Sequence, residues 1–249
     1  LRTLLLLTLS LALSVNALAA QPLRLLANTS PPYADARLPE QGLALELVRH
    51  IFSRTDYQPD ITIEPWSRAM EGVRIGVFDA LATAWYSEER SRDFLFSEPY
   101  LSSRLVIVKS SSDHTVYHDL QDLAGKRLGV RADYAYGIDF GAIPGLQLVT
   151  ENHLIQSLLN LVNGRVDFVI GDQRTMVLQL NEYLASHRGK LQAPAAPLPS
   201  RERHIAAGRN LPNHPEVIKA FNRALAETRR DGSYDAIVAK WDQRLGRLD

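Results

Sequence analysis

Apolar residues along the chain follow two alternating patterns. Short runs at Arg24–Ala27, Ile61–Ile63 and Asp79–Ala84 are typical of strands. Between them, apolar residues recur with helical spacing from Gly42 to Phe52, and a second helical stretch runs from Met70 to Ile75. The order strand, helix, strand, helix, strand predicts an α/β fold, with a largely parallel sheet that carries helices on both faces.

The same pattern occurs a second time further along the chain. Strands are predicted at Arg127–Val130 and Phe168–Ile170, with a helical stripe of leucine and valine residues over 154–162 between them. In both halves a helix leads through a G-x-x-D segment into a strand, at Gly76–Asp79 and at Gly164–Asp167. The repetition predicts two similar α/β lobes with weak internal symmetry.

Two segments are predicted to cross between these lobes. They are the polar run Ser110–Asp113 and the proline-rich run Ala193–Pro199, which cannot be helical. Lobe 1 is therefore expected to hold residues 20–109 and 201–249, and lobe 2 residues 110–200. The returning C-terminal part is predicted to form a helix from Asn213, a turn at 231–234 and a last helix.

The N-terminal residues are typical of a secretory signal peptide. Arg2 precedes an apolar run from Leu4 to Leu13, and small residues follow at Ala17–Ala19. Residues 1–19 are predicted to be this signal, with cleavage after Ala19 or Ala20 and a periplasmic mature protein. The chain contains no cysteine, so disulfides, thiol catalysis and zinc–thiolate sites are excluded.

Charge and motifs narrow the class of function. Lysine and arginine number 28, as do aspartate and glutamate, and a net charge of zero does not favour nucleic acid or anionic lipid as a partner. No phosphate-binding, hydrolase or zinc-protease motif occurs, so no cofactor is expected. His114 and His118 have helical ligand spacing but lack an obvious third ligand, so no metal is predicted either.

Three segments carry a family resemblance. They are Ser87–Tyr100, with its sequence SEERSRDFLFSEPY, then Asp122–Val130, and the C-terminal stretch from Phe221 to Trp241. Together they resemble the family 3 periplasmic solute-binding proteins, the amino-acid-binding components of ABC importers. The resemblance implies a two-lobed type II periplasmic-binding-protein fold, in which each lobe is a mostly parallel sheet flanked by helices and two hinge crossings join the lobes.

Arg90 is the first candidate for ligand binding. It follows a predicted strand, and a guanidinium at such an edge is able to hold a carboxylate through two parallel hydrogen bonds. The resemblance implies this role for Arg90. The alternative is a surface arginine paired with Glu88 or Asp93.

Further candidates lie where predicted strands end, because ligands of open α/β sheets bind beyond the carboxyl ends of the strands. The resemblance implies that Asp172 holds the ligand's α-amino group, although an aspartate there would also cap a helix starting at Gln173. It also implies that Trp66 stacks on the ligand, with a core tryptophan as the alternative. The remaining candidates are Thr83, Trp85, Arg68 as a second cation, and Tyr33, which is otherwise a turn residue.

The chain departs from the resembled family at two places. Trp85 stands where small residues are usual, and Asp133 and Tyr134 replace a glycine and a hydroxyl residue. An inward-facing Asp133 would repel a ligand carboxylate, which questions a plain α-amino acid as the ligand. Tyr134 and Tyr136 add aromatic surface that suits a flatter, larger or more cationic ligand.

These observations predict an exported binding protein, not an enzyme, that delivers a small polar, amino-acid-like ligand to an ABC permease. A monomer is expected. One alternative is an enzyme of the same fold, such as a dehydratase, with Glu64 or Asp133 as acid or base. Another is a soluble receptor that reports ligand to a membrane kinase or chemoreceptor, since a fold does not decide among these functions.

Overall fold

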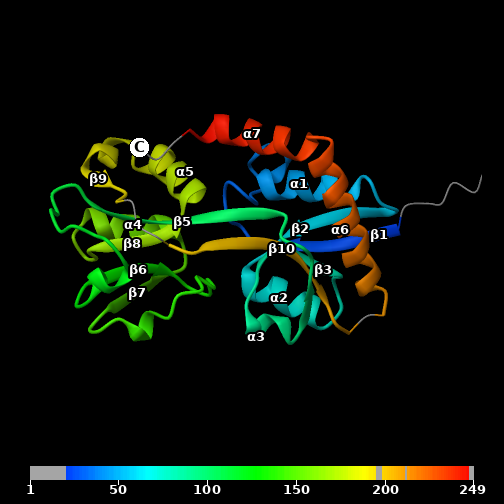
Figure 1. The fold of residues 1–249 in the computed structure, drawn as a ribbon, viewed down its shortest axis with the longest axis horizontal. Coiled ribbons are helices and arrows are strands. Elements are labelled where there is room, and N and C mark those ends of the chain that lie inside the picture. Colours follow the sequence, from blue (N-terminus) through cyan, green and yellow to red (C-terminus); the bar gives the residue numbers. More distant parts are fainter. Residues whose placement is uncertain (1–20, 195–197, 211, 247–249) are drawn as a thin grey trace, which may run out of the picture.

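The computed structural model describes residues 21–194, 198–210 and 212–246, and these form two lobes (Figure 1). One mixed sheet runs through both, in the order β2-β1-β3-β10-β5-β8-β6-β7. The strands of lobe 1 are β1 (Gln21–Ala27), β2 (Tyr57–Ile63), β3 (Ala80–Trp85), β4 (Phe94–Phe96) and β10 (Ser200–Gly208). The strands of lobe 2 are β6 (Arg127–Arg131), β7 (Gln147–Glu151), β8 (Phe168–Asp172) and β9 (Leu191–Gln192).

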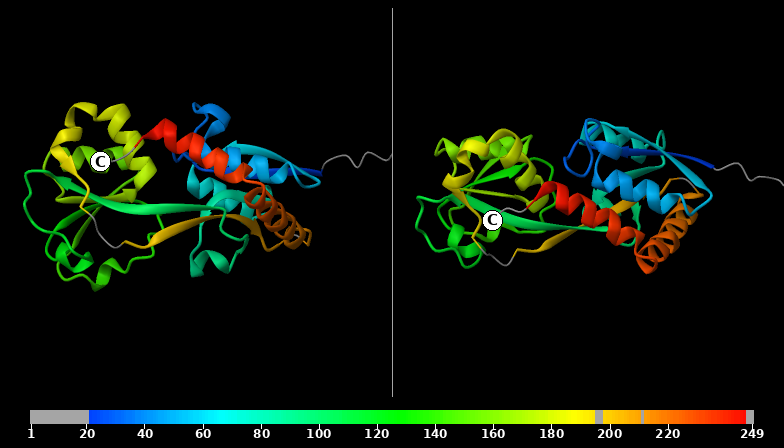
Figure 2. Two further views of the ribbon diagram at one scale, coloured as in Figure 1. Left: turned by 45° about the horizontal axis from the view of Figure 1, so that its top comes forward. Right: turned by 90° about the horizontal axis from the view of Figure 1, so that it is seen from above.

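The strand β5 (Leu101–Ser110) belongs to both lobes. Its residues 101–104 pair with β10, and from Leu105 onward it pairs with β8. Figures 1 and 2 show β5 and β10 running side by side between the lobes. The change of partner at Leu105 lies upstream of the crossing expected at Ser110–Asp113, because one continuous strand serves both lobes. Of the second expected crossing, residues 195–197 lie outside the described part of the chain.

Parallel pairing forms the centre of each lobe. In lobe 1, β1 lies between β2 and β3, and in lobe 2, β6 lies between β7 and β8, with all four pairings parallel. The antiparallel pairings are those made by β5 and β10. The two-lobed α/β architecture predicted from the sequence is therefore confirmed.

Helices cover both faces of the sheet in lobe 1. The helix α1 (Leu43–Phe52) buries its apolar stripe against β2, β3, α6 (His214–Arg230) and α7 (Ser233–Leu245). The opposite face carries α2 (Trp66–Arg74), which begins directly after Pro65, earlier than the pattern predicted. The short helix α3 (Glu88–Ser91) precedes β4.

Lobe 2 is built on α4 (Leu154–Val162) and α5 (Gln173–Tyr183), whose apolar residues form a core with β8. The helix α7 extends from lobe 1 toward α5 (Figures 1 and 2). There Arg174 makes a two-pronged ion pair with Asp242, at 2.7 and 3.0 Å. Short 3-10 helices occur at Pro39–Gln41, Leu120–Leu123, Phe140–Ala142 and Ala185–Lys190.

The two G-x-x-D segments occupy equivalent places in the two lobes. In lobe 1 the Asp79 carboxylate accepts from the backbone N–H of Arg24 at 2.7 Å and from its guanidinium at 3.2 Å. In lobe 2 Asp167 accepts from the backbone of Arg127 at 2.8 Å and from its guanidinium at 2.7 Å. Each aspartate thus ties the start of one parallel strand to its neighbour, and the structure supports the internal symmetry read from the sequence.

The predicted signal peptide, residues 1–19, lies outside the described residues. Among the helices that the structure describes, none combines the length and the hydropathy needed to cross a bilayer.

Candidate ligand-binding site

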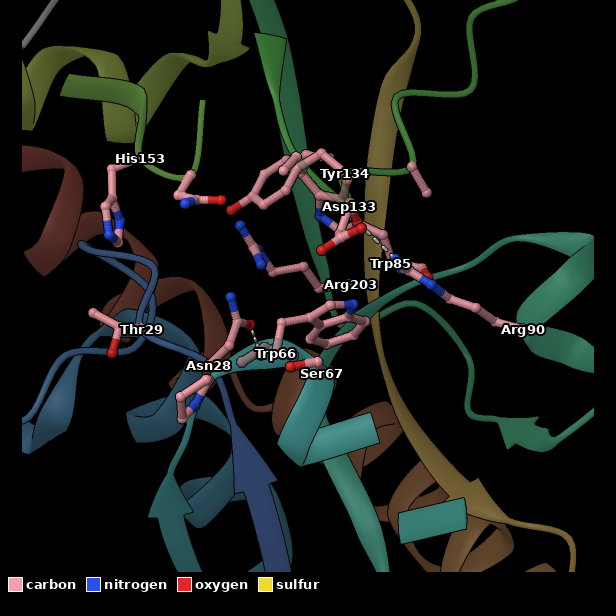
Figure 3. A pocket seen from close by; sticks show the side chains of 15 residues that line it. Asn28, Thr29, Trp66, Ser67, Trp85, Arg90, Asp133, Tyr134, His153 and Arg203 are labelled. Carbon is pink, nitrogen blue, oxygen red and sulfur yellow. Dashed lines mark hydrogen bonds between the residues drawn. The ribbon is translucent and has the colours of Figure 1, made fainter. Parts of the chain in front are cut away.

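A cavity of about 420 Å³ lies between the two lobes. Its walls come from residues that follow the carboxyl ends of β1, β2, β6 and β7, from the last part of β3 and Arg90 beyond it, and from one residue of β10. Ligands of open α/β sheets bind in such a crevice, where strand ends from both halves meet. Figure 3 shows the lining side chains, which are Asn28, Thr29, Pro65, Trp66, Ser67, Thr83, Trp85, Arg90, Ala132, Asp133, Tyr134, Ala135, Asn152, His153 and Arg203.

Arg90 bridges the two lobes at one side of this cavity. It lies on α3, where the Ser87 hydroxyl accepts from its backbone N–H at 3.2 Å and caps the helix. Its guanidinium donates to the Trp85 carbonyl at 2.9 Å and to the Asp133 carbonyl at 3.0 Å. Two of its five N–H groups are thereby used, and the guanidinium keeps donors for a ligand.

Arg90 forms no ion pair with any described residue, so the alternative of pairing with Glu88 or Asp93 does not hold. Burial lowers the pKa of Arg90, and the positive charge of Arg201 lowers it further, against an opposing effect of Glu89. A half-buried cation beside another cation favours the approach of an anion.

Aromatic rings line much of the cavity. The guanidinium carbon of Arg90 lies 4.6 Å from the ring centre of Trp66, a distance typical of cation–π contact. Trp85 and Tyr134 meet edge to face with ring centres 4.8 Å apart, and so join the two lobes across the cavity. These rings offer flat apolar surface to the body of a ligand.

Asp133 has a backbone conformation that glycine prefers. Its φ angle is +58°, in the left-handed region, which accounts for a glycine being usual at this place in the resembled family. Its side chain is exposed and lines the cavity. The sequence left open whether Asp133 faces the cleft, and the structure places it there.

Asp172 and Tyr33 contact one another instead of lining the cavity. The Tyr33 hydroxyl lies 2.8 and 2.7 Å from the two carboxylate oxygens of Asp172. The same carboxylate accepts from the backbone N–H of Thr175 at 2.9 Å, so Asp172 caps α5 as its residue type predicted. Tyr33 lies in a turn, as the alternative expectation had it, but its side chain is buried, and the buried Asp172 is not the open carboxylate that the resemblance implied.

Arg68 is also outside the cavity. Its side chain is largely exposed and pairs with Glu64 four residues earlier, at 2.9 Å. That pairing also occupies one of the two residues considered as an enzymatic acid or base. Thr83 does line the cavity, where its hydroxyl lies 3.5 Å from the Asn28 side-chain oxygen.

The structure thus brings together five of the eight predicted residues, Arg90, Trp66, Trp85, Thr83 and Tyr134, and leaves Asp172, Tyr33 and Arg68 outside the lining. Sequence reasoning missed Arg203, which projects from β10 into the cavity with 3 % of its surface exposed (Figure 3). The sequence contains a signal that could have located Arg203. Arg201 and Arg203 stand at alternate positions, as residues on one face of a strand do, immediately before the buried run Ile205–Ala207.

No cluster of three or more histidine, aspartate or glutamate side chains with metal-ligating geometry occurs in the part of the chain that the structure describes. The cavity's polar side-chain groups include guanidinium, hydroxyl, amide, one imidazole and one carboxylate. Such a set binds a small polar solute through hydrogen bonds and charge.

A two-lobed α/β fold with a solute-sized cavity between the lobes defines the class of periplasmic-type binding proteins. Residues 25–244 match the family described as bacterial extracellular solute-binding proteins, family 3, and the chain belongs to that family.

Individual relatives are distant. A probable amino-acid ABC transporter-binding protein of Haemophilus influenzae is 26 % identical over 80 % of this chain and 75 % of its own length. The histidine-binding periplasmic protein of Salmonella typhimurium is 25 % identical over 94 % of this chain and 95 % of its own. Among solved structures, an ancestral arginine-binding protein bound to arginine superposes with a TM-score of 0.75 at 21 % identity, covering 90 % of this chain and 99 % of its own.

Proposed function

We propose that this protein captures a small polar solute in the cavity between its lobes and delivers it to an ABC importer. One observation carries the proposal: Arg90 lies at the cavity with a guanidinium that no carboxylate of the described residues neutralises, in contact with both lobes. An acidic group of the ligand would complete its hydrogen bonds. Because Arg90 touches both lobes, ligand binding there would favour the closed arrangement of the lobes.

The other four cavity residues of the predicted set have supporting roles in this proposal. Trp66, Trp85 and Tyr134 would enclose the body of the ligand, and Thr83 would hydrogen-bond to it. The names of the curated relatives support an amino-acid-like solute and a permease partner in the membrane. The name of the histidine-binding relative also supports a periplasmic location, which this protein would reach after cleavage of the signal peptide expected at residues 1–19.

A binding role suits this cavity better than catalysis. Asp133 is the one carboxylate among the lining residues, and Glu64, the other nominated acid or base, is held by Arg68 away from it. General acid–base chemistry requires a group within hydrogen-bond reach of the reacting atom. Among the described lining residues the groups of this kind are Asp133 and His153, and no hydrogen bond joins these two side chains as an acid–base pair.

The proposal is tested by screening ligands through their effect on the melting temperature. A ligand that binds the folded state raises that temperature by mass action. The wild-type protein is expected to respond to a subset of amino acids and small organic acids, and Arg90→Ala is expected to abolish the response. Arg92→Ala, an exposed arginine two residues along, serves as the matched control and is expected to respond like wild type.

Two results would contradict the proposal. One is a wild-type protein that responds to no amino acid or organic acid at millimolar concentration. The other is an Arg90→Ala variant whose response equals that of the control.

A further inference from the structure

Arg203 is a buried cation that the protein itself does not neutralise. Its side chain is 3 % exposed, and no carboxylate of the described residues forms an ion pair or hydrogen bond with its guanidinium. Its Nε is buried without a hydrogen-bond partner. Burying a charge without a counter-charge is costly, so such an arrangement marks a functional site more often than a structural one.

Aromatic faces hold Arg203 in place. Its guanidinium carbon lies 3.7 Å from the ring centre of Tyr33 and 5.5 Å from that of Trp85. Cation–π contact with two rings fixes the orientation of the side chain without supplying a negative charge. The guanidinium therefore reaches the cavity oriented and still in need of an anion.

Other cations gather around the same cavity. Arg90 and Arg203 line it, Arg131 packs on Tyr134 at 4.5 Å, and Arg201 stands two residues from Arg203 on β10. None of these four pairs with a carboxylate among the described residues, whereas arginines elsewhere, such as Arg127 and Arg174, do. Against them the lining contributes a single carboxylate, Asp133, so the cavity carries an excess of positive charge.

The acceptor expected for a ligand amine is already occupied. Both oxygens of Asp172 accept from Tyr33, and one also accepts from Thr175. Tyr33 also presents its ring to Arg203, so the same residue removes a carboxylate from the cavity and orients a cation within it. A positively charged ligand group finds no buried carboxylate in this lining.

We propose that the solute is a small organic dianion, with one acidic group on Arg90 and a second acidic group on Arg203. The aromatic rings of Trp66, Trp85 and Tyr134 enclose its carbon body. The ligand needs no amino group. This inference rests on the proposed function, and it differs from the sequence-based expectation of an amino-acid-like or more cationic ligand.

Matched acids test the inference by calorimetry at low ionic strength. Glutarate and phthalate carry two carboxylates, and butyrate and benzoate are their single-carboxylate counterparts. For the wild-type protein each dianion is expected to bind at least about tenfold more tightly than its monoanion, since a charged hydrogen bond contributes roughly that much. Arginine, a cationic amino acid, and histidine, which also carries an α-amino group, are expected to bind more weakly than the dianions.

Arg203→Met isolates the second acidic group. The affinity of this variant for a dianion is expected to fall to its affinity for the matched monoanion. Its affinity for the monoanion is expected to stay within about threefold of the wild-type value. The unliganded variant is expected to melt at a higher temperature than wild type, because it no longer buries an unpaired charge. Arg223→Met, on the exposed face of α6, is the control for loss of one arginine and is expected to match wild type.

A second variant serves if Arg203→Met does not fold. Arg203→Lys keeps the charge but loses the planar pair of donors, and is expected to bind dianions about tenfold more weakly than wild type.

The outcomes separate this inference from the proposed function. Equal affinity for dianions and monoanions, with Arg203 variants unchanged, would overturn the inference alone. If the wild-type protein binds arginine or histidine more tightly than the dianions, the inference is overturned, but the proposed function of solute capture still stands. If the protein binds neither acids nor amino acids, both this inference and the proposed function are overturned.

Discussion

The Tyr33 hydroxyl lies 2.8 and 2.7 Å from the two carboxylate oxygens of Asp172, although the residues are 139 positions apart in the chain. Tyr33 belongs to lobe 1, and Asp172 ends the strand β8 of lobe 2. Burial is the main cause of a raised pKa of Tyr33, with the negative charge of Asp172 as the second, so the phenol stays a donor at neutral pH. The contact joins the lobes and occupies the carboxylate that would otherwise receive an amine.

Tyr33→Phe removes this donor and leaves a buried carboxylate with Thr175 as its remaining partner. The free energy of unfolding is expected to fall by about 1–3 kcal/mol, the cost of leaving such a group unsatisfied. Urea denaturation measures it. Tyr86→Phe, at an exposed tyrosine, is the matched control and should change stability little. Equal stability of the two variants would show that the Tyr33 hydroxyl contributes nothing.

Acid sensitivity is expected to depend on the G-x-x-D aspartate of lobe 2. The hydrogen bond from the Arg127 side chain lowers the pKa of Asp167 below its usual value. A carboxyl whose pKa is lowered by folding contributes stability above its unfolded pKa, and this contribution is lost as the pH falls through the folded value. The gap in stability between wild type and Asp167→Asn is therefore expected to be present at pH 7 and to close below about pH 4.

The difference in the free energy of unfolding between wild type and Asp167→Asn is expected to be at most about 1 kcal/mol. It is small because the ion pair of Arg127 and Asp167 is partly exposed. Urea denaturation at pH 7 and at pH 3 measures it. Asp60→Asn, at an exposed aspartate of β2, controls for the loss of one carboxylate. A gap that stays constant with pH would mean that Asp167 is not coupled to folding through its charge.

Much of this architecture was predictable because it follows from local patterns. The apolar stripe of α1, the G-x-x-D segments and the strand before Arg90 all appear in the sequence as they appear in the structure. The position of the crossing was not predicted, because the sequence indicated a polar segment after the strand as the crossing, whereas the partner changes within β5, between the mostly polar residues 101–104 and the apolar run from Leu105.

Site residues were predictable where a motif located them and not where tertiary contacts decided their role. Arg90 could be found from its surroundings in the chain. Whether Asp172 is open to a ligand depends on Tyr33, and no local pattern reports a contact over that separation. Arg203 was missed because a charged residue in a strand usually faces solvent, whereas here β10 turns it toward a cavity.

Two substitutions at Asp133 separate backbone from charge. Asp133→Gly is expected to raise the free energy of unfolding by up to about 1 kcal/mol, because glycine adopts a φ of +58° without strain. Asp133→Asn keeps a side chain and is expected to leave stability nearly unchanged. Both remove a negative charge from the cavity lining, so both are expected to bind anionic ligands about fivefold more tightly.

Calorimetry and urea denaturation on the same pair of variants provide the check. The sequence-based expectation that Asp133 disfavours plain α-amino acids is tested in the same titrations, since Asp133→Gly should then accept them more readily. If neither variant gains affinity for an acid, the Asp133 carboxylate does not influence the ligand.

Intrinsic fluorescence is expected to report ligand binding through two of the three tryptophans. Trp66 and Trp85 line the cavity, whereas Trp241 is buried in α7 with 2 % of its surface exposed. Ligand is therefore expected to shift the emission of wild type and of Trp241→Phe. The shift should be lost in the Trp66→Phe, Trp85→Phe double variant. A response that disappears with Trp241 instead would place the ligand away from the cavity.

The central claim is that Arg90 holds an acidic group of the solute between the lobes. A crystal structure of the complex with whichever acid gives the largest rise in melting temperature tests it most directly. The account predicts ligand oxygens about 3 Å from the Arg90 guanidinium, inside the cavity formed by the strand ends. A ligand bound elsewhere, or an Arg90 side chain turned away from a ligand within the cavity, would contradict it.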